Sequence, residues 1–169
     1  MEQHDRYAIY EVLLRYARGV DRRDEAVLRS AYHPDGIDHH TGFTGTIDQF
    51  VPWVWDLLCS VDGSMHIIGN HWAELAGDVA VVETYGTSNH WGLPADDPSV
   101  NFSTGFRYVD HMTKVGGRWA IAERWAIREW TRSDVGLLIP KEGKGPSPAR
   151  GPDDIVYRLK RKVLGPSTK

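Results

Sequence analysis

The chain has 169 residues, of which 41% are hydrophobic and 25% charged, a composition typical of one soluble globular domain with a substantial core. Its formal net charge of -3 excludes a general attraction to nucleic acid, and no apolar run approaches the roughly 20 residues that span a bilayer. Cys59 is the only cysteine, so no disulfide forms within the chain, and the N-terminal stretch is too polar for a signal peptide. We therefore expect a cytoplasmic protein that binds neither nucleic acid nor membranes.

The first third of the sequence has helical periodicity. Apolar residues recur every three or four positions over residues 5–20, which predicts an amphipathic helix that weakens near Gly19. Asp24 can then N-cap a short second helix over residues 25–32. The sequence His-Pro-Asp-Gly at residues 33–36 is a strong turn signal.

A third helix is predicted to begin at Thr46, because Gln49 follows at capping-box spacing ahead of an apolar run. After this helix the pattern changes to strands, expected at residues 65–75, 78–91, 102–115 and 118–132. Glycine-containing turns at residues 77–78 and 116–117 separate successive strands.

Helices followed by strands that tight turns connect predict an α+β domain, in which helices cover one face of a curved antiparallel sheet. Residues 93–101 are expected to form a loop at the mouth of a pocket. We place the domain at residues 1–135 and an extended C-terminal arm at residues 136–169. Residues 141–169 carry eight Lys and Arg against three Asp and Glu, which suggests either docking on an acidic surface or a solvated tail.

Known cofactor signatures are missing from the sequence, which lacks G-x-G-x-x-G, G-x-x-x-x-G-K-[ST], G-x-S-x-G and H-E-x-x-H. We therefore expect catalysis by side chains alone, without a cofactor. No metal site is expected either. His66 and His71 are five positions apart on a strand and should face opposite sides, and His39 and His40 lie beside Asp38 in a predicted loop without metal-ligand spacing.

Four side chains on the first long strand share one face by alternation: His66, Ile68, Asn70 and Trp72. If this face looks toward the helices, His66 and Asn70 lie in a cavity. The alternative is a histidine that is hydrogen-bonded within the core.

Three further residues have both a structural and a functional interpretation. Asp21 reads either as a surface carboxylate paired with Arg22 and Arg23 or as a group that points into a pocket. Tyr16 lies on the apolar stripe of the first helix, where a core role is simplest. Arg124 alternates with small residues, which indicates either a cavity or a crowded contact, and its structural alternative is an ion pair across strands with a residue such as Glu83.

Several segments together resemble the SnoaL-like branch of the nuclear transport factor 2-like superfamily. They are "IYEVLLRYARGVDRRD", "YHPDGIDHHTGFTG", "MHIIGNHWAEL", "GDVAVVETY" and "FRYVDHMTKVGGRWAIAERWAIREW", and the resemblance covers roughly residues 5–132. It implies a cone-shaped α+β barrel, with three N-terminal helices packed on a strongly curved antiparallel sheet around an apolar pocket. It also implies a homo-oligomer, either a dimer or a trimer.

In superfamily members such as scytalone dehydratase, bile-acid 7α-dehydratase and hexachlorocyclohexane dehydrochlorinase, the pocket holds an Asp from the first helix and a His from the first long strand. Asp21 and His66 match that pair, and Tyr16 and Arg124 match a polar residue and an arginine that often join it. The implied catalytic set is therefore His66, Asp21, Tyr16 and Arg124. The expected substrate-binding residues are Asn70, Trp72, His40 and Trp53.

The mechanism that this resemblance suggests is elimination from a bulky apolar or aromatic hydroxylated molecule. His66 would remove a carbon-bound proton and Asp21 would orient its ring. Tyr16 would donate to a leaving hydroxyl or to an oxyanion, and Arg124 would stabilise negative charge. The reaction that the resemblance implies is a dehydration or a dehydration coupled to loss of formaldehyde from a lignin-derived diarylpropane diol. The alternatives are a polyketide cyclase, an isomerase or a non-catalytic ligand-binding module.

The spacing of Tyr16 and Asp21 leads to a geometric prediction. Five positions correspond to about 140° around an ideal helix, so the two side chains diverge if the helix is regular. They face one pocket only if the helix ends or bends near Gly19.

Overall fold

The computed structural model describes residues 2–133 of the 169-residue chain. The predicted arm at residues 136–169 lies outside these residues. The described elements, in chain order, are α1 (Glu2–Arg22), α2 (Glu25–Arg29), β1 (Tyr32–His40), β2 (Phe43–Thr46), α3 (Ile47–Cys59), β3 (Gly63–Ala76), β4 (Val79–Trp91), β5 (Phe102–Val115) and β6 (Arg118–Ser133).

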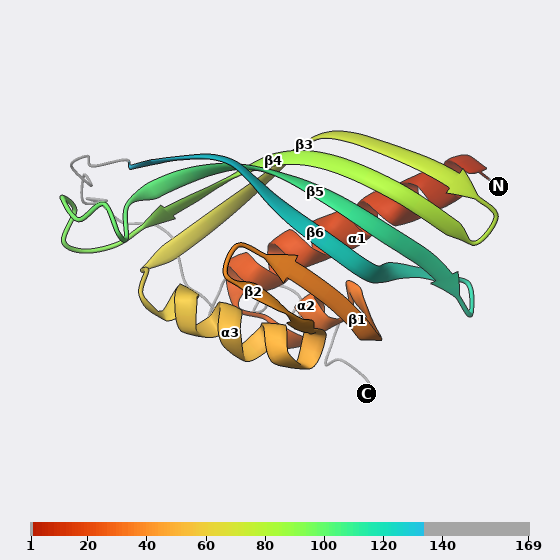
Figure 1. Cartoon of the computed structure of the whole chain (residues 1–169), viewed down its shortest axis with the longest axis horizontal. Coiled ribbons are helices and arrows are strands. Elements are labelled where there is room, and N and C mark those ends of the chain that lie inside the picture. The colour runs from red at the N-terminus through yellow and green to blue at the C-terminus, as the bar shows by residue number, and fades with distance from the viewer. Residues whose placement is uncertain (1, 134–169) are drawn as a thin grey trace, which may run out of the picture.

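The strands form one curved six-stranded sheet in the order β2-β1-β6-β5-β4-β3, with the helices against its concave face (Figure 1). This arrangement confirms the predicted α+β class. The sheet stays open, however, because β2 and β3 are its two edges and do not pair with each other. The sheet is also mixed rather than purely antiparallel, since β1 and β6 run parallel.

The parallel strand β1 was not predicted. Residues 33–36 were expected to form a turn and residues 38–40 a loop, but all of them lie in β1, and α2 ends at Arg29 rather than at residue 32. Strand β6 supplies the hydrogen-bonding edge, with Ile37 opposite Glu123 and His39 opposite Trp125. Pairing with a strand more than 80 positions away in the sequence therefore overrides the local turn preference.

The turns and caps expected in the rest of the domain are confirmed. The β3–β4 and β5–β6 hairpins turn at the predicted glycines, and the connection between β4 and β5 includes the loop predicted at residues 93–101. At the start of α3, the backbone N–H of Thr46 donates to Oε1 of Gln49 at 3.0 Å, as the capping box requires.

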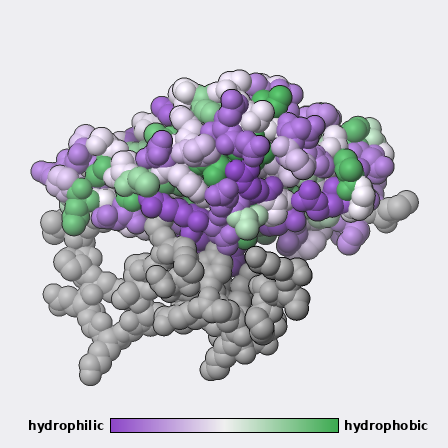
Figure 2. Space-filling view, turned by 90° about the horizontal axis from the view of Figure 1, so that it is seen from below, coloured by the Kyte–Doolittle hydropathy of each residue, from purple (hydrophilic) through white to green (hydrophobic). Residues whose placement is uncertain are grey.

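Among the described residues, the helices lack the length and apolar character that a membrane span needs. Polar side chains cover most of the described face in Figure 2.

Helix α1 continues regularly through Gly19 and ends at Arg22. Its end is closed by two backbone bonds, from Asp24 N–H to Gly19 C=O at 2.9 Å and from Arg23 N–H to Val20 C=O at 3.2 Å. These bonds and the left-handed conformation of Arg23, with a φ of 50°, form a Schellman motif. Asp21 therefore sits in the last turn of a regular helix.

Gly19 allows α1 and α2 to approach closely. A Cβ built at this position would lie 2.5 Å from the backbone nitrogen of Leu28, a contact that backbone atoms cannot relieve without a shift of α2. Gly19→Ala is therefore expected to lower the free energy of unfolding by about 1–3 kcal/mol, measured by urea denaturation. Helix propensity alone predicts the opposite sign, a gain of about 1 kcal/mol, so an increase in stability would contradict the close-packing explanation.

Candidate active site

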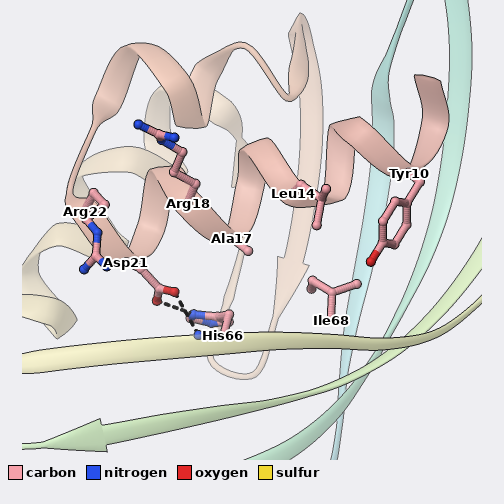
Figure 3. A pocket seen from close by; sticks show the side chains of 8 residues that line it. All are labelled: Tyr10, Leu14, Ala17, Arg18, Asp21, Arg22, His66 and Ile68. Carbon is pink, nitrogen blue, oxygen red and sulfur yellow. Dashed lines mark hydrogen bonds and ion pairs between the residues drawn. The ribbon is translucent and has the colours of Figure 1, made fainter. Parts of the chain in front are cut away.

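Asp21 and His66 form a hydrogen-bonded pair where the end of α1 meets β3 (Figure 3). Oδ1 of Asp21 lies 2.7 Å from Nδ1 of His66, and Oδ2 accepts the backbone N–H of His66 at 2.8 Å. The hydroxyl of Ser64 donates to Oδ1 at 3.1 Å. The carboxylate thus holds both the ring and the backbone of the histidine. Asp21 is therefore not the surface carboxylate that the first interpretation expected. Arg23, one of its expected partners, donates to the backbone carbonyl of Leu58.

These contacts define the protonation of the pair. Burial alone would raise the pKa of Asp21, but hydrogen bonds from the His66 ring and backbone and from Ser64 outweigh it, and the pKa is lowered. An ionised carboxylate only accepts, so Nδ1 of His66 carries the proton shared with Asp21. In neutral His66 the lone pair therefore lies on Nε2, the nitrogen that a base uses.

A cavity of about 290 Å³ lies on one side of His66, between α1, α3 and the sheet. The stacked rings of Phe106 and Tyr108, with centroids 4.3 Å apart, form an aromatic wall along β5. The His66 ring lies 5.9 Å from Phe106, at one end of this wall. Residues from every major element complete the lining, among them Tyr16, His40, Trp53, Leu57, His90, Phe102 and Ala126.

A second hollow, a groove between α1 and β3, lies on the other side of His66. Its lining includes Asp21, His66, Leu14 and Ile68, and the last two face each other across it (Figure 3). Tyr16 lines the cavity and Asp21 lines the groove, so the regular helix directs them to different sides of His66. This divergence is what the 140° spacing predicts for a helix that does not bend near Gly19, and Asp21 supports His66 from behind without access to the cavity.

The predicted placement of Asn70 and Trp72 in the cavity was wrong. Both side chains are exposed on the outer face of the sheet, Trp72 by 66%. Ile68 pairs with Gly86 and His71 with Thr84, so β3 has one more residue than β4 over this stretch and forms a bulge. Beyond the bulge, the side chains of β3 point to the opposite faces from those that simple alternation predicts. For the same reason His71 faces α1, as His66 does, and its ring lies 5.3 Å from that of Tyr10.

His40 and Trp53, the two other predicted binding residues, both line the cavity. The His40 ring stacks on Phe50 with centroids 5.1 Å apart, and Trp53 lies 5.9 Å away. Nδ1 of His40 is hydrogen-bonded to the carboxylate of Asp38, which is fully buried. His40 is therefore held by a carboxylate, as His66 is.

Arg124 does not reach the cavity. It is fully buried and makes two hydrogen bonds of 2.7 Å to Asp110, while Glu83, the partner proposed from sequence, pairs with Arg107. The guanidinium lies 4.2 Å from the Tyr16 ring and 4.0 Å from the Tyr108 ring. Arg124 therefore supports these two cavity rings from behind, and the structure does not favour its direct contact with a substrate.

A bulge in β6 explains the misread surroundings of Arg124. Met112 pairs with Ile121 and His111 with Glu123, so one extra residue lies between the two β6 positions. The bulge brings Arg124 onto the core face together with Trp119, whose Nε1 donates to Asp5 on α1 at 2.8 Å. Of the small residues expected around Arg124, Ala120 precedes the bulge and lies on the other face, whereas Ala126 stays beside Arg124 and lines the cavity.

The burial of two carboxylates, Asp38 and Asp110, was not predicted from the sequence. Asp38 and Asp110 occupy register positions beside Arg124 on the two flanking strands, and all three are fully buried. Burial raises the pKa of Asp110, although the facing guanidinium limits the rise. The alternation Tyr108, Asp110, Met112 in β5 contained a signal, because it places a carboxylate among core residues and thus requires a cationic partner.

Within residues 2–133, no group of three or more His, Cys, Asp or Glu side chains is arranged to hold a metal ion. Two of the three histidines that line the cavity, His40 and His66, have a carboxylate on Nδ1. What the arrangement offers chemically is proton transfer by imidazole groups within an aromatic cavity.

Several known structures have a similar architecture. Hexachlorocyclohexane dehydrochlorinase LinA type 2 superposes with a TM-score of 0.74 at 16% identity, covering 85% of this chain and 97% of that one. A putative scytalone dehydratase from Novosphingobium aromaticivorans gives a TM-score of 0.70 at 17% identity (86% and 97% covered). LinA type 3 from Novosphingobium barchaimii gives 0.67 at 19% identity (83% and 97%).

At these identities the structural likeness shows the fold alone, and a search of curated proteins finds no significant match. The sequence itself gives the family, because the model described as a SnoaL-like domain matches residues 1–125. The chain therefore belongs to the SnoaL-like domain family, with the open cone fold of the nuclear transport factor 2-like superfamily.

Proposed function

We propose that this protein is a cofactor-independent lyase that eliminates water from a compact aromatic or apolar hydroxylated molecule. The observation that carries the proposal is the Asp21–His66 pair, in which a carboxylate fixes Nδ1 and leaves Nε2, on a ring that lines the cavity, to act as a base. A histidine that only filled the core would need no such orientation toward a hollow.

In this mechanism Nε2 of His66 removes a proton from carbon, and the electron pair of the C–H bond becomes the new double bond as the hydroxyl leaves. Asp21 stabilises the imidazolium that forms, because the ion pair strengthens as His66 gains charge. The lowered pKa of Asp21 keeps its carboxylate charged throughout the cycle. The buried, apolar surroundings strengthen this interaction relative to water.

The cavity supports a substrate of one or two rings. Its volume of about 290 Å³ lies just below the roughly 300–1,000 Å³ range for small-molecule sites, so we propose a smaller substrate than the bulky molecule expected from the sequence. Aromatic groups line much of it, including Trp53, Phe102, Phe106 and Tyr108, while Ser88 and Thr104 add hydroxyls. A flat aromatic ring fits such surroundings, because it can stack on the Phe106–Tyr108 wall.

The similar structures include a dehydrochlorinase and a putative scytalone dehydratase, both names for eliminating enzymes, which supports a lyase reaction in general terms. The substrate, the form of the reaction and a homo-oligomeric state remain predictions. Loss of formaldehyde after dehydration is the alternative outcome for a substrate with a neighbouring hydroxymethyl group.

The proposal is tested with two probes of one carbon skeleton. The hydroxy probe is the aldol adduct of benzaldehyde and acetone, whose ketone acidifies the neighbouring C–H bond, and the nitrophenyl probe is its p-nitrophenyl ether. We expect the protein to convert both into the same conjugated ketone, followed by ultraviolet absorbance. A panel of aryl diols, analysed by product mass, distinguishes loss of water alone from additional loss of formaldehyde. Tight binding of these compounds without conversion would favour the ligand-binding module instead.

Asp21→Asn tests the orienting role of the carboxylate. Asparagine cannot accept all three hydrogen bonds from His66 and Ser64, because its NH₂ group must replace one acceptor. The His66 ring can then place its proton on Nε2, so elimination of the nitrophenyl probe is expected to fall by about 10²-fold. A rate equal to wild type would show that His66 acts without Asp21.

The same variant has a predicted signature in stability. The folded pKa of Asp21 lies below its ordinary value of 3.8, so its contribution to stability is full above that value and is lost as the pH falls through the folded pKa. Acid unfolding of Asp21→Asn should therefore lack this part of the pH dependence below about pH 4. Urea titrations of both proteins between acidic and neutral pH measure the difference.

A further inference from the structure

A second histidine–carboxylate pair faces the same cavity. Asp38 accepts hydrogen bonds from Nδ1 of His40 and from the hydroxyl of Tyr32, and its side chain is fully buried. The His40 side chain remains 21% exposed and lines the cavity. Nε2 of His40 lies 3.4 Å from the Tyr16 hydroxyl, longer than the usual hydrogen bond, so this nitrogen can still engage a ligand oxygen.

His66 and His40 lie beside different rings of the aromatic wall. His66 adjoins Phe106, and the His40 ring lies 6.4 Å from Tyr108, the other ring of the stack. A ligand that stacks on this wall therefore has one imidazole beside each end. Elimination of water needs two proton transfers, because one proton leaves a carbon atom and another must reach the departing oxygen, and an imidazole beside each end of the ligand can serve both.

The charges around the second pair favour a proton donor at His40. Asp38, Arg124 and Asp110 occupy neighbouring register positions on β1, β6 and β5, all fully buried. Two carboxylates against one guanidinium leave one formal negative charge in the row, and Nδ1–H of His40 donates to its Asp38 end. The groove beside the Asp21–His66 pair is lined by Arg18 and Arg22, whose positive charges offset the single carboxylate of that pair.

We propose that His40, held by Asp38, is the general acid that protonates the leaving hydroxyl. This inference rests on the proposed lyase function. His66 takes the proton from carbon, the C–H electron pair forms the double bond, and the C–O electron pair moves to oxygen. Nε2–H of His40 transfers its proton to that oxygen, which leaves as water. His66 ends protonated and His40 neutral, and proton exchange with water restores both.

The leaving group tests this assignment, because p-nitrophenoxide departs without a proton and hydroxide does not. His40→Gln is expected to slow elimination of the hydroxy probe by about 10²-fold and to leave elimination of the nitrophenyl probe close to wild type. The control is His39→Gln on the same strand. His39 contacts Thr44, Glu123 and Trp125 outside the cavity lining, and its variant should convert both probes normally.

His40→Gln leaves Asp38 buried with one partner fewer, so folding is checked by near-ultraviolet circular dichroism. If that variant does not fold, Asp38→Asn/His40→Gln removes the carboxylate as well and should show the same selective loss. Equal slowing of both probes by a folded variant would overturn the assignment of His40. If His66→Gln leaves both probes unaffected, or the wild type eliminates neither, the proposed function itself fails and this inference with it.

Discussion

Replacement of His66 by glutamine is expected to lower the rate of elimination of the nitrophenyl probe by about 10²- to 10⁴-fold, the usual contribution of a positioned base. Glutamine has no group that accepts a proton from carbon near neutral pH, although its amide can still donate to Asp21. The fall should appear in kcat rather than in KM, because the aromatic wall that holds the ligand is unchanged. Steady-state kinetics at neutral pH measure the two constants.

His71→Gln is the matched control for this variant. His71 lies on the same strand and faces α1 as His66 does, but it hydrogen-bonds Thr84 at 3.0 Å and does not line the cavity. Burial lowers the pKa of His71, so a neutral glutamine replaces a ring that already prefers its neutral form. This variant should keep near-normal kinetics. Comparable losses in both variants would show that the His66 effect is structural.

Replacement of Arg124 by methionine is expected to lower the free energy of unfolding by about 3–5 kcal/mol, because it leaves the carboxylate of Asp110 buried without its cationic partner. The loss of packing between the Tyr16 and Tyr108 rings adds to this cost. Urea unfolding followed by tryptophan fluorescence gives the change. The double variant Arg124→Met/Asp110→Leu should recover much of the loss, since it removes the unpaired charge.

Arg107→Met provides the comparison on the opposite face of the sheet. Arg107 pairs with Glu83 and Glu129 at 2.7 and 3.0 Å, but all three side chains are 30–42% exposed. Removal of an exposed ion pair costs about 1 kcal/mol or less, because water and salt screen it. If the Arg124 and Arg107 variants lose equal stability, the buried row does not act as a charge-balanced unit.

Much of the fold was readable from local sequence. Periodicity located α1 and the four long strands, and the capping box at Thr46 and the glycine turns marked boundaries that depend on neighbouring residues only. The pairing of Asp21 with His66 came instead from resemblance, because the local pattern around Asp21 favoured a surface carboxylate.

Side chains beyond a bulge were misplaced for a physical reason. Alternation predicts a face only while the register is unbroken, and one extra residue reverses every later position. Asn70 lies within the bulge in β3 and Trp72 follows it, and Arg124 follows the bulge in β6. A bulge leaves no clear trace in the spacing of apolar residues within one strand, so these errors could not be corrected from sequence alone.

The sequence by itself determined the α+β class, the order of helices before strands and the residues able to carry proton-transfer chemistry, because these follow from local periodicity and residue type. Only the tertiary structure decided that residues 32–40 form a parallel strand beside β6 and that Asp38 and Asp110 flank Arg124. The reason is that long-range pairing provides the hydrogen bonds and the counter-charges. His40 obtains its place in the cavity in the same way, from a strand that its own residues do not predict.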